Sequence, residues 1–173
     1  MMPNFDVHVG DHYRNLYYFA LSLSRNEADA ADLTQHAYLK LAKHWVKIKN
    51  PSKVKSWLFS TLYRDFIDRK RKRKFESDVQ IETISREISF ESTEAADKHD
   101  SEIAVQALID LQDEYRIPLT LFYLEDYSYK EIAKVLDIPI GTVMSRLHRG
   151  KELLYDKLMK KKTRAPFANS SAL

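Results

Sequence analysis

The stretch from residue 126 to residue 157 constrains the fold of this chain more than any other, because it predicts two amphipathic helices separated by a tight turn. Ser128 can cap the first helix, and Glu131, three residues later, has the spacing of a capping box. Pro139 ends that helix, since the residue before a proline avoids the αR region. Thr142 is expected to cap the second helix. The pattern is typical of a helix-turn-helix, whose second helix enters the major groove of DNA.

The second helix of this pair has an apolar side and a basic side. Val143, Leu147 and Leu154 recur at helical spacing and are expected to pack inward. Arginine side chains bind guanine edges or phosphates, and a helix N-terminus favours phosphate. The alternative, a surface helix with a solvated basic face, does not explain why the inner and outer faces fit together. The residues expected to bind DNA fall at i, i+3, i+4 and i+7 of one face: Thr142, Ser145, Arg146 and Arg149.

Charge is distributed unevenly along the chain, although the net charge is only +3. Residues 51–74 hold nine Lys/Arg and two Asp, residues 75–102 hold nine Asp/Glu and two Lys/Arg, and residues 139–164 hold eight Lys/Arg and two acids. Two basic blocks around an acidic one predict two nucleic-acid surfaces and one segment that avoids or mimics nucleic acid. The six consecutive cations at 69–74 are expected to repel one another too strongly to pack, and so to favour phosphate.

Three glycines and five prolines in 173 residues favour helices, and we predict an all-α chain. It should form two small helical domains, at 1–74 and 101–159, joined by a flexible acidic linker at 75–100 and followed by a flexible basic tail at 160–173. In the first domain, helices are expected over 11–24, after a cap at Asn26, and from Pro51 to Lys74, with Asn50 as the cap.

Several classes of protein are disfavoured. The sequence has no cysteine, which excludes a disulfide framework and a Cys-type zinc finger. No P-loop, nucleophile elbow or HExxH pattern is present, and isolated i, i+4 pairs such as His8 with His12 indicate a metal site only weakly. We therefore expect no enzyme activity, no cofactor and no metal. Without an apolar signal core or a run approaching 18 apolar residues, the chain is expected to be cytoplasmic and not inserted in a membrane.

Two segments carry a resemblance to a known family. YSYKEIAKVLDIPIGTVMSRLHRGKELL resembles the −35 promoter domain of the extracytoplasmic-function (ECF) group of the sigma-70 family, the short sigma factors of bacterial RNA polymerase. DLTQHAYLKL, followed by SWLFSTLYRDFIDRKRKR, resembles the domain that binds polymerase and opens the −10 element. The resemblance covers nearly the whole chain. It implies promoter-specific transcription initiation with core RNA polymerase and, as for many members, an anti-sigma factor as a further partner.

The resemblance also implies roles for individual residues. Asp32, Gln35 and Leu39 would bind the clamp coiled coil of the largest polymerase subunit. In −10 DNA, cations hold phosphate and aromatic rings stack on unpaired bases, although aromatic residues at helical spacing more often belong to a core. The connector 47–53 would contribute to a pocket for a flipped base. The residues expected to bind and melt −10 DNA are Lys53, Trp57, Tyr63, Arg64, Arg69 and Arg71.

Four positions depart from the family pattern. His36 stands where an acid is usual, Arg64 where asparagine is frequent, Asp137 where glycine is often found in the helix-turn-helix corner, and Met144 where a basic residue is common. These departures bear on core binding and on promoter preference. A second hypothesis is a stand-alone helix-turn-helix regulator, which would bind DNA without polymerase, usually as a dimer, and would not need the basic helix at 51–74.

Overall fold

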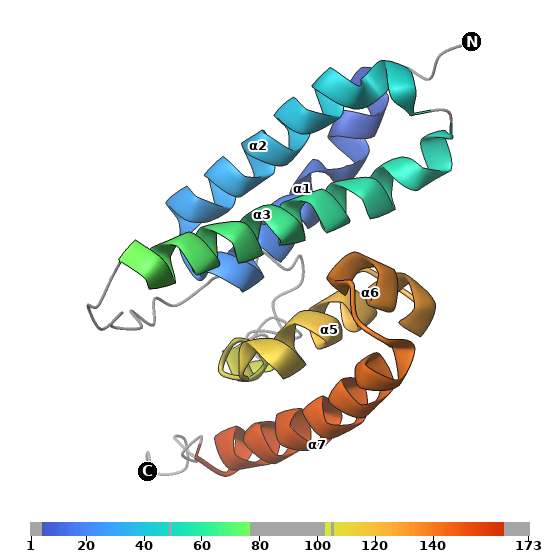
Figure 1. Cartoon of the computed structure of the whole chain (residues 1–173). Helices are drawn as coiled ribbons and strands as arrows, with labels where there is room; N and C mark the ends of the chain where they lie inside the picture. Colours follow the sequence, from blue (N-terminus) through green and yellow to red (C-terminus); the bar gives the residue numbers. More distant parts are fainter. Residues whose placement is uncertain (1–4, 49, 77–102, 105, 165–173) are drawn as a thin grey trace, which may run out of the picture.

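The chain folds into two groups of helices, as a computed structural model shows for residues 5–48, 50–76, 103–104 and 106–164 (Figure 1). The first group contains α1 (Phe5–Ser24), α2 (Glu27–His44) and α3 (Val54–Glu76), with short 3-10 turns at Trp45–Lys47 and Pro51–Lys53 between α2 and α3. The second group contains α5 (Asp113–Tyr123), α6 (Tyr129–Leu136) and α7 (Ile140–Arg164). No strand occurs in these ranges, which confirms the predicted all-α class for them.

The ends and the core of the first bundle follow from local sequence. The side-chain oxygen of Asn26 accepts a hydrogen bond from the backbone N–H of Asp29 at 3.0 Å, and Asn50 accepts one from the backbone N–H of Ser52 at 3.0 Å, so both predicted caps are confirmed. Burying a large apolar side chain contributes ~1.5–3 kcal/mol, so the inward faces hold the bundle together. Among the fully buried side chains are Leu16, Phe19, Leu33, Leu41, Leu58 and Leu62.

α6 and α7 form the predicted helix-turn-helix. The Glu131 carboxylate accepts hydrogen bonds from the backbone N–H and the hydroxyl of Ser128 at 2.8 and 2.7 Å, which lower the pKa of Glu131 and complete the capping box. Asp137 ends α6 in the left-handed region, with φ of 54°, and donates its N–H to the Ala133 carbonyl. The expectation that Thr142 caps α7 is wrong: α7 begins at Ile140, so Thr142 already lies in its first turn.

α5 and α7 cross at close range because position 150 has no side chain. A Cβ at Gly150 would lie 2.9 Å from Leu119 Cδ1, well inside normal contact distance. Val143 and Leu147, on the same helix, are buried as predicted. α7 continues to Arg164, past the boundary expected at residue 159, and residues 165–173 lie outside the described part of the chain.

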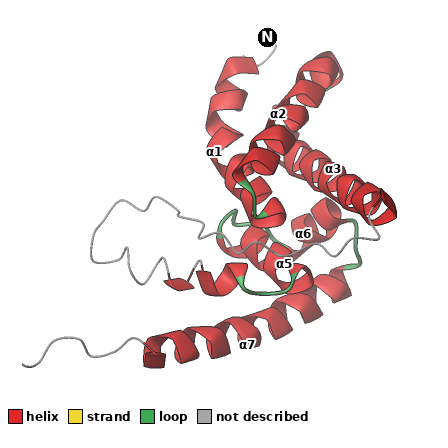
Figure 2. Ribbon diagram, turned by 90° about the vertical axis from the view of Figure 1, so that its left-hand side faces the viewer, coloured by secondary structure: helices red, strands yellow, loops and turns green. Residues whose placement is uncertain are grey.

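The two groups of helices are packed against each other. α5 and α6 lie between the α1–α3 bundle and α7, and α6 contacts α3 while α5 contacts α1 (Figures 1 and 2). The rings of Phe59 and Tyr127 meet edge to face, with centroids 5.5 Å apart. Lys70 Nζ lies 2.7 Å from Asp113 Oδ2. The sequence predicted two units but not this contact. Residues 75 and 76 of the expected linker continue α3, and the rest of it lies outside the described residues.

Two arginines from different groups share the same backbone carbonyls. Arg25, at the α1–α2 corner, donates to the carbonyls of Ile109 and Leu111 at 2.9 and 3.1 Å, and Arg116 donates to the same two oxygens. Burial lowers the pKa of Arg116 to about 10, an effect that Asp113 opposes and Arg25 reinforces. This convergence fixes the α1–α2 corner against the chain that precedes α5.

Candidate nucleic-acid interface and partner-binding surface

A stripe of exposed side chains runs along α2. Asp32, Gln35 and Leu39 are all exposed at helical spacing, so the structure places the three predicted polymerase-binding residues on one face. Leu39 is 59% exposed, and Val46, in the 3-10 turn that follows α2, is 78% exposed. Exposed apolar side chains near a carboxylate and an amide have the composition of a partner-binding surface. The prediction omitted Val46, which lies beyond the end of α2, where the periodicity of the helix does not place it.

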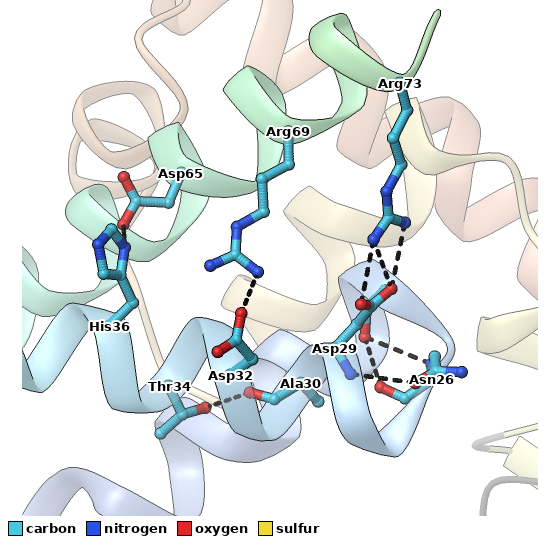
Figure 3. Close-up of polar contacts among 10 residues, drawn as sticks. Asn26, Asp29, Ala30, Asp32, Thr34, His36, Asp65, Arg69 and Arg73 are labelled. Carbon is cyan, nitrogen blue, oxygen red and sulfur yellow. Dashed lines mark hydrogen bonds and ion pairs between the residues drawn. The ribbon is translucent and has the colours of Figure 1, made fainter. Parts of the chain in front are cut away.

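A row of ion pairs joins α2 to α3 (Figure 3). Both guanidinium nitrogens of Arg73 bond the Asp29 carboxylate at 3.1–3.2 Å, and Arg69 Nη1 donates to Asp32 Oδ2 at 2.6 Å. Together with Lys70 on Asp113, these pairs correct the expectation that the cations at 69–74 are too repulsive to pack. Acidic residues of α2 and of α5 offset their charge. Below, the pairs Asp29–Arg73 and Asp32–Arg69 are called the acid–arginine seam.

Elsewhere on the same two helices the charges are exchanged, because the basic side chains lie on α2 and the acidic one lies on α3. His36 Nδ1 lies 2.8 Å from Asp65 Oδ2, and Lys40 Nζ lies 2.5 Å from Asp65 Oδ1. Asp65 is only 8% exposed, so these contacts join α2 to α3 through one buried carboxylate. The departure at His36 therefore has a structural role, as a partner of Asp65.

Trp57 lines an open pocket of about 380 Å³ near the start of α3. The Trp57 ring is half-buried against the core and lies 6.0 Å from the ring of His44, so part of it is a core contact and part is a wall of the pocket. Aromatic walls with cations nearby are the arrangement that holds an unpaired base and its phosphates. The other residues that line the pocket are His44, Lys47, Ile48, Asn50 and Lys53.

A second pocket, of about 500 Å³, lies between α3 and the helix-turn-helix. Tyr63, Arg64 and Arg71 line it from α3, and Arg146 lines it from α7. Burial raises the pKa of the Tyr63 hydroxyl, while the nearby Arg146 opposes that shift. Three of the residues predicted to bind −10 DNA therefore face one that was predicted to bind −35 DNA.

The outer face of α7 is only partly directed to solvent. Ser145 and Arg149 are exposed, whereas Thr142 and Arg146 are half-buried. Arg149 Nη1 donates to Glu152 Oε2 at 3.0 Å. Met144, which is 53% exposed, and His148 share the exposed surface and were not among the predicted site residues. The sequence analysis noted Met144 only as a departure from the family pattern, and His148 is a weak DNA signal by itself, so neither was assigned to the site.

These features define a helical DNA-binding protein with a helix-turn-helix and a second, basic helical unit. Across the residues described, no helix is long and apolar enough to cross a membrane, and no three acidic or histidine side chains are grouped as metal ligands. Residues 8–76 match the family model described as Sigma-70 region 2, and residues 101–154 match the one described as Sigma-70, region 4.

Comparison with individual proteins agrees with both matches. ECF RNA polymerase sigma factor SigE of Mycolicibacterium smegmatis is 33% identical over 92% of this chain, which spans 63% of that protein. RNA polymerase sigma factor SigV of Bacillus subtilis is 31% identical over 88% of this chain and 89% of its own length. The crystallised sigma factor RpoE of Bartonella quintana, in complex with the anti-sigma factor NepR, is similar with a TM-score of 0.74 and 29% identity, covering 90% of this chain and 96% of that one.

The chain therefore belongs to the ECF group of the sigma-70 family. It is an RNA polymerase sigma factor that directs transcription initiation, and it is not an enzyme.

Proposed function

We propose that this sigma factor assigns its three tasks to three helices: α2 binds core polymerase, α3 binds and melts −10 DNA, and α7 reads −35 DNA. The observation that carries the proposal is the exposed stripe of Asp32, Gln35 and Leu39, which leaves a partner-binding face on α2 beside the basic α3. A stand-alone DNA-binding regulator has no need of that face. The corresponding domains are those expected at 1–74 and 101–159.

For −10 DNA, the Trp57 pocket supplies the chemistry of strand opening. Melting without ATP requires unpaired bases to be trapped, and stacking on an aromatic ring contributes ~1–3 kcal/mol per base. Lys47 and Lys53 line the same pocket and can hold the adjoining phosphates. Tyr63, Arg64 and Arg71 extend this surface along α3.

For −35 DNA, the exposed part of α7 makes the base contacts. Arg149 and Ser145 face solvent and can approach base edges in the major groove. Thr142 lies in the first turn of α7, where the helix dipole favours a phosphate. Arg146 joins this group once the pocket that it shares with α3 opens.

The partners follow from the same assignment. Core RNA polymerase binds the α2 stripe through the clamp coiled coil of its largest subunit, and promoter DNA binds α3 and α7, which places the protein in the cytoplasm. An anti-sigma factor is a further partner, because the structurally similar RpoE of Bartonella quintana was crystallised with one.

Run-off transcription on genomic DNA tests the proposal. Core polymerase with this chain should produce transcripts from specific start sites, and core polymerase alone should not. The Asp32→Ala/Gln35→Ala variant should lose both core binding in a pull-down and these transcripts. The matched control is Glu27→Ala, which removes one exposed carboxylate from the same helix. A chain that shifts promoter DNA without polymerase and supports no transcript would instead be a stand-alone regulator.

A further inference from the structure

We propose that the acid–arginine seam couples polymerase binding to DNA binding: Asp32 holds Arg69 away from DNA in the free chain, and polymerase docking on Asp32 releases it. The inference rests on the proposed assignment of Asp32 to the polymerase surface. It adds that the two binding surfaces share one ion pair, so that each regulates the other.

The geometry of the seam brings the two surfaces together. Asp32 belongs to the exposed stripe of α2, and its Oδ2 accepts a hydrogen bond from Arg69 Nη1 at 2.6 Å. Arg69 belongs to the basic run that ends α3, where nucleic-acid phosphate is the expected ligand. One turn away on each helix, the Asp29 carboxylate accepts hydrogen bonds from both terminal guanidinium nitrogens of Arg73 (Figure 3). The carboxylates of Asp32 and Asp29 thus bind the guanidinium groups of Arg69 and Arg73, to which a phosphate could otherwise bind.

The seam is accessible to both competitors. The Asp32 side chain is 66% exposed and that of Arg69 is 32% exposed, so a cation of polymerase can approach the carboxylate from solvent. Any cation that bonds Asp32 competes with Arg69 for the same negative charge. Such coupling is reciprocal, so a phosphate that binds Arg69 makes Asp32 a better ligand for polymerase.

A purely structural role for the seam is the competing explanation. α2 and α3 are, however, already joined by His36 and Lys40 on the buried Asp65. Exposed pairs such as Asp32–Arg69 add little to the stability of a fold. Removing Asp32 should therefore change binding while leaving the bundle folded.

DNA affinity of the full chain without polymerase tests one side of the coupling. Fluorescence anisotropy with a duplex of unrelated sequence should show Asp32→Asn binding about two- to fivefold more tightly than Asp68→Asn, the range expected for an exposed ion pair. Asp68→Asn is the matched control, because Asp68 is exposed on α3 beside Arg69 and its removal alters net charge equally. The slope of log affinity against log salt should steepen by up to about 0.9 for Asp32→Asn, one added phosphate contact.

Further variants make the test decisive. Asp32→Asn/Arg69→Ala and Asp68→Asn/Arg69→Ala, which have the same net charge, should bind the duplex equally, because Asp32 then has no arginine to hold away from DNA. Arg69→Ala should also bind core polymerase about two- to fivefold more tightly than Lys72→Ala, which removes another exposed cation of α3. Equal DNA affinities of Asp32→Asn and Asp68→Asn would overturn the coupling and leave only a net-charge effect. Run-off transcription by the unaltered chain would still stand in that case, so the two failures are distinguishable.

Discussion

Lys55 Nζ lies 3.3 Å from Glu125 Oε2, and this pair joins the beginning of α3 to the loop between α5 and α6. Glu125 is only 5% exposed, and it also accepts a hydrogen bond from Asn15 of α1 at 3.2 Å. Lys55 further donates to the Glu125 carbonyl at 3.0 Å and lies over the ring of Tyr127. A carboxylate of the second group of helices is thus held by two helices of the first.

Replacing Lys55 with alanine should destabilise the packing between the two groups. The substitution leaves the buried Glu125 carboxylate without its cation, and an unsatisfied buried group costs ~1–3 kcal/mol. Urea unfolding at pH 7 should show this loss for Lys55→Ala, whereas Lys47→Ala, which removes an exposed lysine of the same bundle, should stay within ~0.5 kcal/mol. Equal midpoints for the two variants would contradict the pairing.

The stability of the chain should depend on pH through Glu125. Burial raises the pKa of this carboxyl above its ordinary value of 4.5, although Lys55 and Asn15 oppose the shift. The folded chain therefore binds the Glu125 proton more tightly than the unfolded chain. The resulting stabilisation is complete below pH 4.5 and is lost as pH rises through the folded pKa. Glu125→Gln should lack this loss, so its plot of unfolding free energy against pH should be flatter just above pH 4.5. Parallel plots for the two proteins would exclude the effect.

Trp57→Ala should impair strand opening more than promoter binding. Loss of one stacking contact costs ~1–3 kcal/mol, about a tenfold defect or more. Permanganate reactivity of thymines near −10 should fall, and a template already unpaired at −10 should restore transcription, because the DNA then supplies the missing free energy. Because part of the Trp57 ring is buried, a thermal melt is needed as a control for folding. Normal permanganate reactivity in a folded variant would mean that Trp57 acts only in the core.

Arg149→Ala should weaken binding to −35 DNA by ~1–3 kcal/mol if Arg149 contacts a base, and should relax the preference at one position. Lys130→Ala removes an equal charge from the exposed face of α6 and serves as the control. Competition binding of polymerase holoenzyme with promoter variants would measure both effects. A uniform loss on all sequences would show that Arg149 contacts phosphate instead.

Asp137→Val should destabilise the helix-turn-helix, whereas Asp137→Gly should be tolerated. The φ of 54° at this position is disfavoured for residues with a Cβ, by roughly 1–2 kcal/mol, and most strongly for branched ones. Glycine adopts this conformation readily. Urea unfolding of the two variants compares them directly, and equal stability would exclude strain at the corner.

The parts of this structure that depend on nearby residues could be predicted, and those that depend on the meeting of distant residues could not. The Ser128–Glu131 capping box, the Asn26 cap and the buried Val143 each follow from spacing within one or two turns. The pairs of Arg69 and Arg73 with acids of α2 depend on the register between two helices, which no local pattern encodes. Repulsion within the run 69–74 was therefore overestimated.

The residues of the candidate site also differ in whether the sequence could predict their surroundings. The residues of the α2 stripe were expected from the family resemblance, and helical periodicity accounts for their position on one face. For α7, periodicity placed Arg146 with Arg149, yet Arg146 lines a pocket with Tyr63 because α6 packs against both α3 and α7. The sequence of α7 does not indicate that Arg146, one residue of its outer face, is half-buried by another part of the chain.

The pocket shared by Arg64 and Arg146 also bears on how far the chain must extend along a promoter. Elements centred near −10 and −35 are about 25 base pairs apart, or ~85 Å of duplex at ~3.4 Å per base pair. If α3 binds −10 DNA and α7 reads −35 DNA, as proposed, side chains that line one pocket of about 500 Å³ cannot reach both ends of such a span. Under that assignment, promoter binding requires α3 and α7 to move apart, and the packed arrangement of the two groups of helices is that of the free chain.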